Sequence, residues 1–333
     1  NVQQLLSKST VLQIAYVANR GVQLYSDVDL NQADNALVLQ ALNAAGGPLQ
    51  FYSASDFIPY EQAARPFVTN CTTGAGPCLP YIRFLNFLGN KSTSSYQGLQ
   101  TTLTHRYSKG LYLLAGYTWA HAIDTAGNTN NLGYAPQNSL NYAAEKGNGD
   151  YDIRQRFTLS ATYDLPSRKS WGQLLEGWQV TSIFQAETPM PILMYDNRYD
   201  LTLTGEGPGN GNNDRWNILG DPGKLKVSTE PIPRLSWDDP VCQAAATTQA
   251  LQDGLYWVGH CYAQNGVVLY PQAFATFGNM GRNILRGPNF VNLDFSVSKA
   301  WKLNEKFRLQ LRGECFNILN HTNFAYPTGS LRS

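Results

Sequence analysis

The residue types that most often catalyse reactions or bind metals are sparse in this chain. Its four histidines, His105, His121, His260 and His321, form no HExxH motif and no paired spacing of the kind that holds zinc. The glycine-rich stretch GPGNG at 207–211 lacks the Lys-Ser/Thr and the following helix of a phosphate-binding loop, so a flexible turn is the simpler interpretation. We therefore expect no enzyme activity and no cofactor.

Two oxygen-rich segments of the chain are candidate calcium sites. Asp150 and Asp152, or the segment from Asn210 to Asp214, could offer oxygens to calcium, but their spacing matches no calcium-binding loop. Asn, Asp and Gly are also ordinary turn formers. The sequence favours turns here and does not decide about calcium.

Five cysteines are distributed unevenly. Cys71 and Cys78 lie close together, Cys242 and Cys261 lie in one long polar region, and Cys315 stands alone. Two loop disulfides in an oxidising compartment fit these positions, as do free thiols, because pairing cannot be deduced from sequence alone. Cys315 falls on the apolar side of an alternating stretch, where we expect it to pack.

The composition narrows the class of protein. Charged residues make up 15% of the chain, below the roughly 25% of soluble domains, whereas aromatic residues reach 12%. No run of about 18 apolar residues is present, so a transmembrane helix is excluded, although membrane β-strands of about 9–11 residues leave no such run. A net charge of +1 gives no electrostatic signature of nucleic-acid binding.

Alternation of apolar and polar side chains predicts strands with two unlike faces. The stretch FRLQLRGECF at 307–316 is one example, because side chains at period two point to opposite sides of a strand. The pattern is equally clean at 157–165 and 291–298. About eight strands follow from it, the others at 2–6, 10–19, 99–107, 111–123 and 176–187.

The connections between these strands alternate in length. Short turns at 7–10, 108–110, 166–175 and 302–306 alternate with connections of about seventy, thirty and a hundred residues. A soluble sandwich and a membrane barrel both fit the alternating strands. Only outer-membrane barrels regularly place short periplasmic turns on one side and long extracellular loops on the other. We therefore predict an all-β fold, an antiparallel transmembrane β-barrel.

The barrel hypothesis assigns the two faces of each strand. The apolar face meets lipid and the polar face lines the lumen, where water or a plug satisfies the charges. Lys299 and His105 share the apolar face but stand near turns, where a charge costs little. The lumen candidates are Arg106, Asp294, Arg308, Arg312 and Glu314, each of which could equally be a plain solvated residue. The expected periplasmic aromatic girdle is Tyr107, Tyr163, Trp178, Trp301 and Phe307, with Trp119 in the outer one.

Several segments, in order, resemble one family. FGNMGRNILRGPNFVNLDFSVSKAWKLNEKFRLQLRGECFNILNHTNFAYP (277–327) resembles the C-terminal strands of TonB-dependent outer-membrane transporters of the Oar-like group, with a GRN…RGP loop and an FN.(L/F)NH.NF ending. SSYQGLQTTLTHRYSKGLYLLAGYTWAHAID (94–124), DIRQRFTLSATYDLP (152–166) and EGWQVTSIFQAETPMPI (176–192) are similar to the same family.

The resemblance implies a twenty-two-stranded barrel closed by an N-terminal plug and driven through a TonB box. Residues 1–333 would then be the C-terminal part of the barrel, a partial outer-membrane barrel from which the plug domain, signal peptide and last strand are absent. The implied partners are outer-membrane lipid, a TonB-type energising protein and an unknown extracellular ligand.

The expected function is an outer-membrane receptor and transporter that takes up, or less plausibly exports, a ligand. A passive channel or structural barrel is one alternative, distinguished by whether a plug and TonB box precede Asn1. A secreted β-rich carbohydrate-binding protein is another, distinguished by solubility without detergent. The substrate and the direction of transport cannot be read from the sequence.

Overall fold

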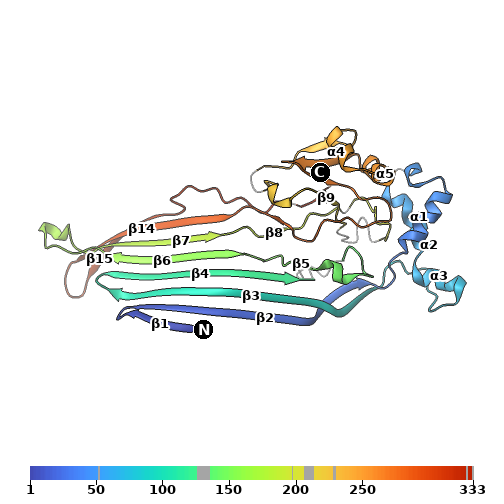
Figure 1. Cartoon of the computed structure of the whole chain (residues 1–333). Coiled ribbons are helices and arrows are strands. Elements are labelled where there is room, and N and C mark those ends of the chain that lie inside the picture. Colours follow the sequence, from blue (N-terminus) through green and yellow to red (C-terminus); the bar gives the residue numbers. More distant parts are fainter. Residues whose placement is uncertain are drawn as a thin grey trace.

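The computed structural model describes residues 1–51, 53–125, 136–196, 198–205, 214–227, 230–327 and 329–331. It consists of one long antiparallel sheet with a folded loop region at one end and tight turns at the other (Figure 1). We call these the loop end and the turn end. No helix in the described ranges is both long enough and apolar enough to cross a bilayer.

All eight strands that the alternation predicts are present in this sheet. Its order is β1-β2-β3-β4-β6-β7-β14-β15, and β5 pairs with β4. The strands β2 and β3, at 20 and 23 residues, are longer than predicted because they continue into the loop region. The bounds are β1 Val2–Ser7, β2 Thr10–Asp29, β3 Asn86–Ser108, β4 Leu111–Asp124, β5 Gly147–Asn148, β6 Gln155–Asp164, β7 Trp178–Glu187, β14 Phe290–Lys302 and β15 Arg308–Cys315.

The sheet is open. Within the described part of the chain, β1 pairs only with β2 and β15 only with β14, so the two outermost strands keep one free edge each. A closed barrel is therefore not formed by these residues alone.

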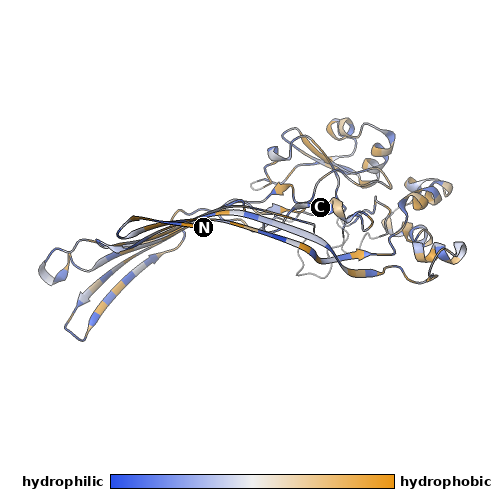
Figure 2. Ribbon diagram, turned by 60° about the horizontal axis from the view of Figure 1, so that its bottom comes forward, coloured by the Kyte–Doolittle hydropathy of each residue, from blue (hydrophilic) through white to orange (hydrophobic). Residues whose placement is uncertain are grey.

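The register separates an apolar face from a polar face. Directly paired residues in antiparallel strands point to the same side. One row across five strands is wholly apolar: Leu103, Ala115, Leu159, Phe184 and Leu293. The adjacent row, on the opposite face, is Thr102, Gly116, Thr158, Gln185 and Asn292. Figure 2 shows the same alternation of hydropathy along the strands.

The loop region folds into a structure of its own, which the sequence did not predict. The β2–β3 connection supplies α1 (Asn35–Ala44), α2 (Ile58–Ala63), α3 (Pro66–Thr73) and the 3-10 turns η1 (Pro48–Gln50) and η2 (Ala54–Phe57). The β4–β6 connection carries η3 (Tyr142–Glu145). At the turn end, outside the loop region, the β6–β7 turn carries η4 (Trp171–Gln173). The β7–β14 connection supplies the remaining elements: η5 (Pro222–Lys224), α4 (Pro240–Ala245), α5 (Gln249–Val258), β8 (Pro191–Ile192), β9 (Asn217–Leu219), β10 (Arg234–Ser236), β11 (His260–Gln264), β12 (Val267–Tyr270) and β13 (Leu285–Arg286).

One hydrophobic core joins the first and last of these connections. Leu42 and Phe57 from the β2–β3 connection are fully buried in the same cluster as Leu201, Trp216 and Leu269 from the β7–β14 connection. Phe57 stacks on the ring of Trp257 with a centroid separation of 5.4 Å. The two connections therefore fold as one body, which local sequence patterns cannot reveal.

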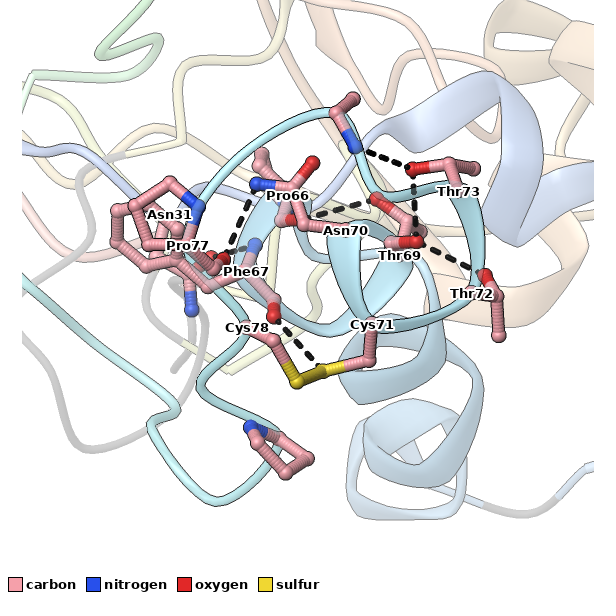
Figure 3. Close-up of a disulfide and its surroundings, with 12 residues drawn as sticks. Asn31, Pro66, Phe67, Thr69, Asn70, Cys71, Thr72, Thr73, Pro77 and Cys78 are labelled. Atoms are coloured by element: carbon pink, nitrogen blue, oxygen red, sulfur yellow. Dashed lines mark hydrogen bonds between the residues drawn. A yellow bond between two sulfur atoms is a disulfide. The ribbon is translucent and has the colours of Figure 1, made fainter.

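Two disulfides staple this region. Cys71 at the end of α3 is bonded to Cys78 in the following loop, beside the hydrogen bond from the Asn70 side chain to the Pro77 carbonyl (Figure 3). Cys242 of α4 is bonded to Cys261 of β11, and both sulfur-bearing side chains are fully buried. Cys315 is a free thiol and is exposed, since every residue of β15 is exposed in this open sheet.

The difference in burial predicts an order of reduction. Mild reductant should open Cys71–Cys78 first, because both of its cysteines are exposed, whereas Cys242–Cys261 should resist until the loop region unfolds. Peptide mapping after stepwise reduction and alkylation measures this order. Simultaneous alkylation of all four cysteines under native conditions would contradict the packed loop region.

Candidate functional site

The polar face of the sheet carries four of the charged residues expected to line a lumen. Arg312 and Glu314 pair with Ser298 and Ser296 of β14, and their own side chains form an exposed ion pair at 2.6 Å. Asp294 accepts hydrogen bonds from the Asn292 side chain and the Asn317 backbone. Arg308 pairs with Lys302 on the same face.

A β-bulge changes the position of one predicted girdle residue. His105 pairs with Leu113, but Ser108 pairs with Leu111, so Arg106 and Tyr107 together oppose one residue of β4. The position of Arg106 on the polar face stays a prediction, because the bulge leaves this residue without a direct partner in β4. Tyr107 does not join the apolar face: its hydroxyl donates to Asp164, a polar-face residue. The strict alternation of side chains between the two faces fails here because the bulge adds one residue to β3.

Tyr107 therefore belongs to a polar cavity at the turn end. The cavity has a volume of about 550 Å³. The side chain of Gln179 donates to Asp164 at 2.8 Å on its wall. Other lining residues include Lys109, Ser298, Arg308 and Gln310. The polar face thus ends in a charged, hydrogen-bonded hollow.

The other expected girdle residues lie at the turn end. The register places Tyr163, Trp178 and Trp301 on the apolar face, and Phe307 immediately precedes β15 and is exposed. Between the two tryptophan rings lies the ammonium of Lys299, 5.7 Å from the Trp178 centroid and 4.9 Å from that of Trp301.

Both basic residues expected on the apolar face are partnered. Lys299 is 2% exposed, and its ammonium donates to the backbone carbonyls of Gln173 and Glu176 in the β6–β7 turn. The His105 ring lies 2.8 Å from the hydroxyl of Thr10. The sequence indicated that these residues stand near turns, but not what they bind.

At the loop end, the GRN…RGP motif fastens the loops to the sheet. The fully buried guanidinium of Arg282 donates to Asp124 at the end of β4 and to the carbonyl of Glu145, and lies 3.5 Å from Asp150. Arg286 donates to Asp152 at 2.5 Å and to the Pro189 carbonyl at 3.2 Å. Two arginines of one motif thus hold the β4–β6 connection beside β13.

Asp152 is held as a carboxylate. Burial acts to raise its pKa, but hydrogen bonds from the Ala122 N–H, Arg286 and His121 outweigh it and leave the pKa below its usual value. Asp150 accepts from the side chain of Asn283 at 2.6 Å. Guanidinium and amide groups therefore bind both of the carboxylates considered for calcium, Asp150 and Asp152.

The other calcium segment is described only in part. The glycine-rich stretch at 207–211 and the calcium candidates at 210–213 lie outside the described residues. The last residue of the calcium segment, Asp214, accepts a hydrogen bond from the Thr202 hydroxyl at 3.0 Å. Within the described ranges, no three His, Cys, Asp or Glu side chains are grouped so that they could hold a metal ion.

A second cavity, of about 260 Å³, lies in the loop region. Its wall contains the buried ion pair of Arg215 and Glu145, with N–O distances of 2.7 and 3.1 Å. Gln137 also lines it and is 2% exposed, and among the described residues neither atom of its side-chain amide has a hydrogen-bond partner. A buried polar group without a hydrogen bond costs about 1–3 kcal/mol. Asn138, Asn141, Phe277 and Asn279 complete much of the lining.

A buried carboxyl cluster lies deeper in the loop region. The pKa of Glu61 is raised to about 9, first by burial and then by the nearby charge of Asp200 and a hydrogen bond with it, against the opposing effects of Arg83 and Arg65. Asp214 is fully buried, and its pKa is also raised, first by burial and then by Asp200 and Asp196. Neither residue was singled out for this role from the sequence, because burial is not visible there.

The sheet has one apolar and one polar face, and its short and long connections lie at opposite ends. These are the features of a membrane-spanning β-sheet. A family model described as "Outer membrane beta barrel domain" matches residues 1–333, and the chain belongs to that family. It is therefore a protein of the bacterial outer membrane. No curated protein and no solved structure matches the chain.

The motif arginine gives a test of the loop attachment. Arg282→Met should lower the free energy of unfolding by about 3–5 kcal/mol, because it removes a fully buried guanidinium that binds both Asp124 and the Glu145 carbonyl. Arg312→Met is the matched control: its pair with Glu314 is exposed, and its loss should cost about 0–1 kcal/mol. Urea unfolding in detergent, followed by tryptophan fluorescence, measures both. Equal effects would contradict the role of the motif.

The Glu61 pKa predicts a pH dependence. Because the folded-state pKa of about 9 lies above the usual glutamate value of 4.5, the folded state binds more protons between these pH values, and the free energy of unfolding falls as pH rises through this window. Glu61→Gln should flatten the pH dependence of the melting temperature from about pH 4.5 to 9. An unchanged slope in the variant would show that Glu61 does not cause it.

Proposed function

We propose that this chain is the ligand-capturing part of an outer-membrane receptor and transporter, with the loop end outside the cell and the turn end in the periplasm. The observation that carries the proposal is a polar face that runs along the sheet from a folded, cavity-bearing loop region to a second polar cavity. The length difference between the two sets of connections supports the assigned orientation.

The loop region is suited to first contact with a ligand. Its shared core, two disulfides and buried ion pairs fix the positions of its side chains. In the 260 Å³ cavity, Arg215 and Glu145 offset each other's charge, and the other polar lining groups are uncharged amides. An uncharged ligand rich in hydrogen-bonding groups fits this lining, which includes the side chain of Gln137.

The polar face offers the route onward. Asp294, Arg312 and Glu314 lie along β14 and β15, and Arg308 lies at the turn-end cavity. In a plugged barrel these groups contact the plug or water, as the resemblance to TonB-dependent transporters implies. No covalent chemistry is proposed for them.

The free edges of β1 and β15 require further strands. Unpaired backbone groups are not tolerated in the hydrocarbon core of a bilayer. We infer that the sheet is part of a wider closed barrel, twenty-two-stranded if the resemblance holds. A passive channel is the second candidate, because a polar lumen also allows solutes to diffuse through a barrel without an energy source.

Solute uptake separates the two candidates. Cells that express the full gene product should show the protein in the outer membrane with heat-modifiable migration, and should deplete a solute from the medium only while the inner membrane is energised. Mass spectrometry of the medium, with and without a protonophore, measures this. Gene-dependent depletion that is unchanged by the protonophore would favour the channel.

Gln137→Met keeps the side-chain length, removes the amide, and should reduce energised uptake several-fold while the amount of protein in the membrane stays the same.

A further inference from the structure

The β6–β7 turn, residues 166–177, is unusual among the short turns because it folds back onto the sheet. The ammonium of Lys299 donates to its Gln173 and Glu176 carbonyls, and the Trp178 indole donates to the Leu174 carbonyl at 2.7 Å. The side chain of Gln173 exchanges two hydrogen bonds with the backbone of Lys302, at 2.9 and 3.0 Å. Five hydrogen bonds therefore fix this turn to β7 and β14.

The contacts show which side of the sheet the turn covers. Lys299 and Trp178 pair with each other, and their row continues through Leu311, all on the apolar face. The carbonyls at 173–176 are bonded to the side chains of Lys299 and Trp178, so the tip of the turn lies over the apolar face. The base of the turn, at Pro166, Ser167 and Gly177, lines the polar cavity.

The outward surface of the turn is apolar at its tip and basic at its flank. Trp171 is 89% exposed, and Leu174 and Leu175 are 54% and 59% exposed. Arg168 and Lys169, directly before the tip, are also exposed. The carbonyls of Gln173 and Glu176 are bonded to Lys299, while these apolar side chains stay more than half exposed.

We propose that this turn is a membrane anchor that inserts Trp171, Leu174 and Leu175 into the interfacial region of the phospholipid leaflet at the turn end, with Arg168 and Lys169 among anionic headgroups. The inference rests on the proposed membrane orientation. Continuity argues for lipid over a protein partner: the turn extends the apolar face beyond Trp178 and Trp301. Tryptophan beside basic residues is also the composition that membrane interfaces favour.

Spin labels at single cysteines test the anchor. Cys315→Ser leaves no free thiol in this sequence, since the other four cysteines form disulfides. Labels at Leu174→Cys, Leu99→Cys and Tyr81→Cys are compared in the protein reconstituted into bilayers of phosphatidylethanolamine and phosphatidylglycerol. Leu99 lies on the apolar face of an inner strand and is the lipid control; Tyr81 is 97% exposed in the loop region and is the water control.

The readout is the ratio of collision with oxygen, which concentrates in lipid, to collision with a water-soluble nickel chelate. This ratio should be several-fold higher at Leu174 than at Tyr81, approaching that at Leu99. A lipid-like Leu99 with a water-like Leu174 would overturn the anchor and leave the membrane barrel intact. A water-like Leu99 would overturn both.

Lys299→Met tests the fastening separately. With the ammonium removed, the ratio at Leu174 should fall toward that at Tyr81, while the ratio at Leu99 should not change. An unchanged ratio at Leu174 would show that Lys299 does not hold the turn against the apolar face.

Discussion

The antiparallel hydrogen-bond ladder is the constraint on which the rest of this molecule depends. A bilayer offers no water to the backbone, so each strand within it must find its partners in its neighbours. The register from β2 to β15 does this and at the same time aligns rows such as Leu103, Ala115 and Leu159 across the sheet. Backbone satisfaction and the separation of the two faces are thus consequences of one pairing pattern.

Charges are placed to respect that separation. On the polar face, Arg312 and Glu314 remain exposed and form a weakly stabilising pair. On the apolar face, Lys299 is retained at the turn end, enclosed by two indole rings and by turn carbonyls. A positively charged side chain is therefore tolerated on either face. Water solvates it on the polar face, and the carbonyls of the folded turn bind it on the apolar face.

The loop end follows a different physical logic. Away from lipid, the connections can bury ionic groups, and the GRN…RGP motif uses this: Arg282 and Arg286 bind carboxylates from the connection that follows β4. Breaking such pairs is costly, so they favour one arrangement of loops over the sheet. Because the loop region has a fixed shape, the cavity lined by Gln137 has a fixed shape as well.

The sequence by itself determined the strands, their two faces and the sides on which short and long connections lie. These follow from period-two alternation, which is local and survives without knowledge of partners. Arg308 and Glu314 were placed on the polar face on that basis. Only the tertiary structure decided the rest. The bulge that moves Tyr107, the pairing of Cys242 with Cys261, the shared core of Leu42 and Leu269, and the carbonyl ligands of Lys299 all join residues distant in the chain. Their contacts depend on how far-separated segments pack, and no local pattern records that.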